Sequence, residues 1–122
     1  MVDYKFYNAN PLKKIEQDCV CRAISRATRL SYKNIEHKLK LIGELCDCDE
    51  LCVCCYNHLL ENVFGLKSKK ANGKLVRDVV NDYNENILLL RLEGHLTMAE
   101  FGVVYDLWDC RDEKVDIFWI VD

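Results

Sequence analysis

The hydrophobic pattern of the chain changes once, near Asn86, and this change limits the folds that the chain can adopt. Before Asn86, apolar residues recur at spacings of three and four, which is typical of amphipathic helices. After it, short apolar runs and alternating segments are separated by turn residues, which is typical of strands. Helices followed by strands predict an α+β fold, with N-terminal helices packed on a C-terminal antiparallel sheet.

The expected elements follow from the same patterns. An extended segment is expected over 1–17, and helices over 18–29, 31–43, from Asp47 or Asp49 to 65, and over 75–83. Gly43 and Gly65 are expected to end the second and third helices, because glycine readily adopts the left-handed conformation that closes a helix. The expected strands are 87–90, a hairpin of 95–101 and 103–108 that turns at Gly102, and a last strand over 115–121 buried on both faces.

Length and charge exclude several classes of protein. With 122 residues, the chain is expected to form one domain over 1–122. The net charge of −3 gives no overall attraction to nucleic acid or to anionic membranes, and four neighbouring lysines are expected to be solvated: Lys67, Lys69, Lys70 and Lys74. No apolar run approaches the length of a membrane span or a signal peptide, so we expect a cytoplasmic protein whose eight cysteines stay reduced.

One cysteine lies where a helix is expected to begin. Asp18 suits the cap position, because a short carboxylate can accept hydrogen bonds from the first-turn N–H groups. Cys19 then falls in the first turn, where the helix dipole favours thiolate over thiol. This is a typical setting for a nucleophilic cysteine, although a free cysteine is more commonly a small buried apolar residue.

Two residues of the expected hairpin complete a catalytic pattern. A thiol nucleophile needs an imidazole within hydrogen-bonding reach, and the imidazole needs a third group that orients it. His95 begins one strand of the hairpin, and a turn at Gly102 brings Asp106 back toward it. The oxyanion hole is then expected to use the Cys19 backbone N–H and one side-chain amide. The candidates for that amide are Gln17, Asn8 and Asn10, with Gln17 as the working assignment.

Two motifs resemble a known family. The run Asp18-Cys19-Val20-Cys21-Arg22-Ala23-Ile24 resembles the DCVVRAI opening of small papain-like proteins from bacteriophages and bacterial mobile elements. The segments 94–99 and 102–109 resemble the GHLTA and G-x-x-YDTWD ending of the same proteins, and 115–120 resembles their closing strand. These proteins are similar to bacteriocin-processing cysteine peptidases. The resemblance covers the first helix pair and about the last 30 residues, and leaves out 46–74.

The resemblance implies a papain-like core with Cys19 as nucleophile, His95 as general base and Asp106 as orienting residue. Asp109 is the alternative third member. The implied reaction is acyl transfer through a thioester on a peptide or isopeptide bond, with a peptide or protein as substrate and no cofactor. The chain departs from the family at Cys21, where the family has a small apolar residue. The alternative is a catalytically silent papain-like protein that binds a host component.

A second group of cysteines suggests a metal site. Five cysteines and a histidine fall within 13 residues: Cys46, Cys48, Cys52, Cys54, Cys55 and His58. Thiolates and imidazole are zinc ligands, but the spacing lacks the paired C-x2-C knuckles of standard zinc sites. We therefore expect reduced thiols and no metal here, and we expect His37 and His58 to be ordinary histidines on helix surfaces.

Overall fold

The computed structural model describes residues 2–10, 18–47 and 53–122 of the chain. Its helices are α1 (Cys19–Thr28), α2 (Tyr32–Cys46), α3 (Val53–His58), which continues as the π-helix η1 (Leu59–Val63), and α4 (Val76–Asp82). Its strands are β1 (Asp3–Phe6), β2 (Ser68–Lys70), β3 (Ile87–Leu92), β4 (His95–Glu100), β5 (Val103–Asp106) and β6 (Ile117–Ile120). The fold class is therefore α+β, as the sequence pattern predicts.

The strands form one mixed sheet in the order β1-β5-β4-β3-β6-β2. Four of the five strand pairs are antiparallel, whereas β1 pairs in parallel with β5. The prediction of a purely antiparallel, C-terminal sheet is wrong in this respect. Two short strands from the first 70 residues extend its edges, because the N-terminal segment runs alongside β5 and the segment after η1 runs alongside β6.

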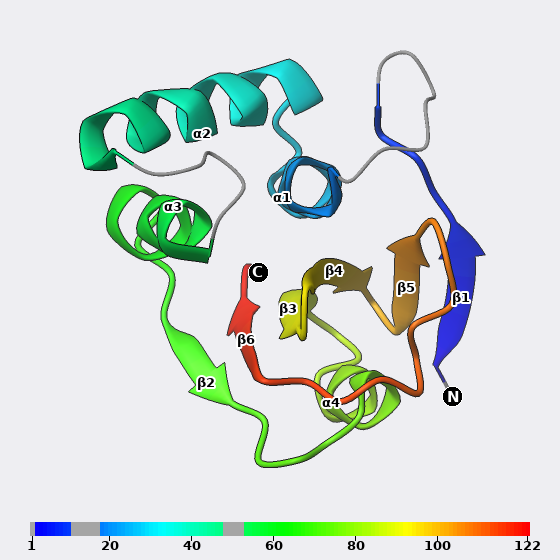
Figure 1. Cartoon of the computed structure of the whole chain (residues 1–122). Coiled ribbons are helices and arrows are strands. Elements are labelled where there is room, and N and C mark those ends of the chain that lie inside the picture. The colour runs from blue at the N-terminus through cyan, green and yellow to red at the C-terminus, as the bar shows by residue number, and fades with distance from the viewer. Residues whose placement is uncertain (1, 11–17, 48–52) are drawn as a thin grey trace.

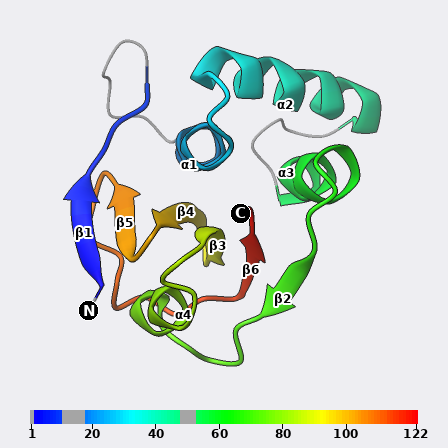
Figure 2. The same cartoon turned by 180° about the vertical axis from the view of Figure 1, so that it is seen from behind.

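The sheet is curved and has helices on both faces. Figure 1 shows α1, α2 and α3 on the convex side and α4 on the concave side, and the view from behind in Figure 2 shows the same layers. Each face buries its own apolar cluster. Phe118 and Trp119 of β6 belong to opposite clusters, so the prediction that the last strand is buried on both faces is confirmed.

The end of α2 differs from the prediction. The helix passes through Gly43 and continues to Cys46, and Asp47 ends it with a φ of 53°. The Asp47 N–H donates to the Gly43 carbonyl. A glycine inside a helix costs only about 1 kcal/mol relative to alanine, so the surrounding helical residues outweigh it.

Two tight turns set the geometry of the central strands. The β3–β4 hairpin turns at Glu93-Gly94 and pairs Leu92 with His95. The β4–β5 hairpin is confirmed, but its turn contains two residues, Phe101 and Gly102, which both have positive φ. Such two-residue turns match the twist of the strands that they join. As a result, the start of β4 and the end of β5 lie at the same end of the sheet.

Within the described residues, no helix combines the length and the apolar character that crossing a membrane requires.

Candidate functional site

Helix α1 carries Cys19 to the sheet. Cys19 is the first residue of the helix and is partly exposed, whereas Ala23 and Ile24 on the following turns are buried. This apolar face packs against β4, so the N-terminus of α1 lies beside the strand that begins with His95. The N-terminus of a helix presents unpaired N–H groups and a partial positive charge. The fold therefore places the thiol in the setting that its sequence position predicts.

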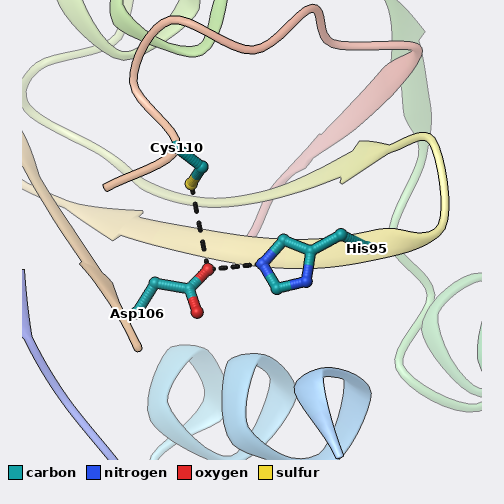
Figure 3. Close-up of side chains that lie close together, drawn as sticks. All are labelled: His95, Asp106 and Cys110. Atoms are coloured by element: carbon teal, nitrogen blue, oxygen red, sulfur yellow. Dashed lines mark hydrogen bonds and ion pairs between the residues drawn. The ribbon is translucent and has the colours of Figure 1, made fainter. Parts of the chain in front are cut away.

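His95 and Asp106 are hydrogen-bonded to each other. The imidazole Nε2 lies 2.6 Å from Asp106 Oδ2, as Figure 3 shows. Asp106 is buried, and its other oxygen, Oδ1, accepts from the Leu107 N–H at 2.7 Å. Because Nε2 faces the carboxylate, Nδ1 is the ring nitrogen left for Cys19, which is hydrogen-bonded to His95. The structure thus brings the three predicted residues together in the order Cys19, His95, Asp106.

The protonation equilibria of this trio favour an ion pair. Burial disfavours the charged imidazolium, but the hydrogen bonds and charges of Asp106 and Cys19 outweigh it and raise the pKa of His95 to about 9. Burial also favours the neutral thiol, yet the hydrogen bonds from His95 and the Leu96 backbone lower the pKa of Cys19 below its ordinary value. The pKa of Asp106 is lowered as well, because its hydrogen bond and charge interaction with His95 outweigh burial. These shifts move the trio toward a thiolate beside an imidazolium.

A buried arginine ties the site to the start of α1. Arg22 forms an ion pair with Asp18, and its guanidinium also lies 3.9 Å from Asp106 Oδ1. Asp18 occupies the N-cap position, but its carboxylate does not cap the helix as predicted. It instead accepts from Tyr32 Oη at 2.7 Å and from Asn10 Nδ2 at 3.1 Å. The stronger charge of Arg22 one turn along the helix has displaced the backbone N–H groups as the partner of Asp18.

Replacing Arg22 should destabilise the protein. The Arg22→Met variant keeps the length of the side chain but leaves the buried carboxylate of Asp18 without its cation, and we expect the free energy of unfolding to fall by about 3–5 kcal/mol. The matched control is Arg77→Met, which removes the exposed ion pair with Asp112 and should cost less than about 1 kcal/mol. Urea denaturation of both variants measures the difference. Equal losses would contradict a buried Arg22–Asp18 pair.

An aromatic ring and a small cavity lie beside the trio. The ring of Trp108 is tilted against the imidazole, with centroids 5.2 Å apart, and Trp108 remains 43% exposed. A narrow cavity borders Cys19, and its lining includes Tyr7 and Tyr105. This cavity has no room for a water molecule.

The other predicted residues divide into three groups. Gln17, the working assignment for the oxyanion hole, lies outside the described residues. Of its alternatives, Asn10 is buried and donates its amide to Asp18, and Asn8 Oδ1 accepts from the Asn10 N–H. The carboxylate of Asp109 accepts from the side chain and backbone N–H of Arg111. Asp106 therefore holds the position toward His95 for which Asp109 was the alternative.

The second cysteine group does not form a metal cluster in the part of the chain that the structure describes. Cys46 and Cys54 are exposed, whereas Cys55 is fully buried in the core. Cys48 and Cys52 lie outside the described residues. Among the described residues, the one group of three potential metal ligands is His95, Asp106 and Cys110.

Sequence reasoning missed two residues of the site. Arg22 could have been predicted, because an arginine four positions after Asp18 on a helix is a recognisable signal for an ion pair. No sequence pattern pointed to Cys110 as part of the site. It is buried, and its Sγ lies 3.8 Å from Asp106 Oδ2 and 3.6 Å from Thr97 Oγ1.

No family model matches the chain, and comparisons with the curated proteins and with the solved structures find no match either.

Proposed function

We propose that the protein is a papain-like cysteine peptidase or amidase with a Cys19–His95–Asp106 triad. The observation that carries this proposal is the hydrogen-bonded chain from a thiol at a helix N-terminus through an imidazole to a buried carboxylate. The three side chains come from α1, β4 and β5, so the packing of α1 on the β4–β5 hairpin brings them together. The same three residues occupy the nucleophile, base and orienting positions that the resemblance implies.

The geometry supports acyl transfer in two stages. The Cys19 thiolate attacks the carbonyl carbon of a peptide or isopeptide bond, and the imidazolium of His95 donates its proton to the departing amine. This leaves a thioester on Cys19 and a neutral imidazole. His95 then removes a proton from water and becomes imidazolium again, while the hydroxide adds to the thioester carbonyl. The tetrahedral intermediate collapses with cleavage of the C–S bond, which releases the thiolate and a carboxylic acid, and the acid loses its proton to solvent.

The remaining groups orient and stabilise these steps. Asp106 holds Nε2 of the ring, so that Nδ1 faces the sulfur throughout the reaction. The backbone N–H groups at the start of α1 are suited to stabilising the oxyanion of the tetrahedral intermediate. Arg22 forms an ion pair with Asp18 and lies 3.9 Å from Asp106 Oδ1. These contacts fix the Asp106 carboxylate relative to the helix that carries Cys19.

Selective alkylation tests the activated thiol. We expect a limiting dose of iodoacetamide at pH 6 to modify Cys19 at least about tenfold faster than the exposed Cys54, because the neighbouring imidazolium keeps Cys19 ionised below its ordinary pKa. Peptide mass spectrometry of the singly labelled protein locates the modified residue. As the pH rises toward 9, ordinary thiols ionise and the preference for Cys19 should shrink.

The control for this experiment is His95→Ala. Without the imidazole, burial raises the pKa of Cys19 and the preference at pH 6 should disappear. Preferential labelling of Cys21 or of the cysteines over 46–55, with Cys19 inert, would contradict the assignment.

A catalytically silent papain-like protein that binds a host component is the second candidate. The narrow cavity beside Cys19 favours it, because this cavity has no room for a water molecule. Incubation with a peptide library, followed by mass spectrometry of new termini, distinguishes the two candidates. New termini that depend on Cys19 support the peptidase, whereas a labelled thiol with no cleavage supports the binding protein.

A further inference from the structure

Three chemically different ligand atoms converge behind the catalytic histidine. His95 Nε2 and Cys110 Sγ both approach the same oxygen, Asp106 Oδ2, at 2.6 Å and 3.8 Å, and Figure 3 shows them reaching it from two directions. All three ligand atoms lie within 4.8 Å of one another. Cys110 and Asp106 are buried, and only 12% of the His95 side chain is exposed. The triad described above uses two of these residues and leaves the third without a role.

An imidazole nitrogen, a carboxylate oxygen and a thiolate are the three ligand types that Zn²⁺ binds in proteins. With zinc–ligand bonds of about 2.0–2.3 Å, tetrahedral ligand atoms lie about 3.3–3.8 Å apart. The Cys110–Asp106 distance already fits this range, and the His95–Asp106 pair must open by about 1 Å. Thr97 Oγ1, 3.6 Å from the sulfur, offers a neutral oxygen for the fourth position.

The charges also balance. A divalent cation bound by one thiolate, one carboxylate and one neutral imidazole has no net charge, and a neutral assembly is the form that a buried site tolerates best. Binding requires two protons to be released to solvent: the thiol proton of Cys110 and the imidazolium proton on Nε2 that faces Asp106. The metal must also replace the 2.6 Å hydrogen bond between His95 and Asp106, and this competition favours a reversible site over a permanently loaded structural one.

We propose that His95 Nε2, Asp106 Oδ2 and Cys110 Sγ form a reversible binding site for a thiophilic divalent cation such as Zn²⁺, and that the bound metal inhibits Cys19. The metal takes the place of the hydrogen bond between His95 and Asp106. The imidazole then carries its proton on Nδ1 and its metal on Nε2, and rotates away from the position that Asp106 now defines. The binding half of the proposal stands by itself, whereas the inhibition half rests on the proposed function.

Cobalt and zinc together test the binding and the inhibition. The starting protein is the full chain in which Cys46, Cys48, Cys52 and Cys54 are replaced by serine, so that the second cysteine group cannot compete. Co²⁺ should produce the thiolate-to-metal charge-transfer absorption of a cysteine-ligated site, and Zn²⁺ should displace it. Excess Zn²⁺ should also slow the alkylation of Cys19 by at least about tenfold, as expected when an orienting partner is lost.

Two variants test whether Cys110 is the cysteine that binds the metal. Cys110→Ser keeps the size of the side chain but removes the thiolate, so it should lose the charge-transfer band and reduce the zinc effect on Cys19 to less than about twofold. The matched control, Cys21→Ser, changes a buried cysteine of α1 and should retain both signals. If either serine variant fails to fold, the alanine variant at the same position serves instead.

The outcomes separate the two proposals. If Cys110→Ser is slowed by zinc as strongly as the starting protein, the metal binds the Cys19 thiolate directly and the inference is wrong. Absence of a cobalt band in the starting protein also overturns it. If Cys19 is inert without metal but the Cys110-dependent band is present, the proposed peptidase function fails while the metal site stands.

Discussion

Replacing Cys19 with alanine is expected to abolish cleavage of peptide substrates, lowering kcat by about 10⁴-fold or more. The reason is that the thiolate forms the covalent intermediate, and no other side chain in the described part of the chain holds the same position toward His95. The thiol at Cys21 is only two residues away, but it is 3% exposed and belongs to the apolar core. Side chains two apart on a helix point about 200° away from each other, so Cys21 cannot replace Cys19.

The matched control is therefore Cys21→Ala, with Cys21→Val as a second variant that restores an apolar residue at the position where the resembled family has one. Both should retain most of the activity, and Cys21→Ala should lower the free energy of unfolding by about 1 kcal/mol, because it removes a buried sulfur. New peptide termini, measured by mass spectrometry, and urea denaturation follow the two effects separately. Full activity in Cys19→Ala would remove the basis of the proposed mechanism.

Replacing Asp106 with asparagine is expected to lower kcat by about 10²–10⁴-fold with a smaller change in KM. Asparagine keeps the shape of the side chain but removes the charge, so it no longer stabilises the imidazolium or holds one tautomer of His95. Loss of this charge should also move the pKa of His95 down from about 9 toward the ordinary value of histidine. NMR titration of the His95 ring measures this shift independently of any substrate.

Asp109→Asn is the matched control, because Asp109 is the neighbouring exposed carboxylate and binds Arg111 instead of His95. It should leave both kcat and the His95 titration essentially unchanged. If the His95 pKa is unaffected by Asp106→Asn but falls in Asp109→Asn, the assignment of the third residue is reversed.

These experiments differ in whether they need a known substrate, and this determines their order. The NMR titration and the alkylation at pH 6 need no substrate, so they can establish the state of the trio before a substrate is found. The peptide library then distinguishes an active peptidase from a binding protein that has kept the same arrangement. The cobalt experiment is independent of all three, since a metal site needs only the geometry behind His95.

The sequence by itself determined the elements whose signals are local. The helical spacing of Val20, Ala23, Ile24 and Ala27 predicted α1, and all four are buried on it. The turn signal at Gly102 predicted the β4–β5 hairpin, because glycine readily adopts the positive φ that such a tight turn requires. This hairpin was sufficient to predict that Asp106 approaches His95.

Only the tertiary structure decided the features that depend on distant segments. The parallel pairing of β1 with β5 joins residues about 100 positions apart, and a four-residue strand has no sequence pattern that names its partner. The Asp18 carboxylate does not cap α1, because it pairs with Arg22 instead of with the backbone N–H groups. Which of these partners it takes depends on how deeply the charges of Asp18 and Arg22 are buried, and only the fold decides that. Cys110 lies against Asp106 because the chain after β5 turns back over β4, and a sequence does not specify where such a loop comes to rest until the core beneath it has formed.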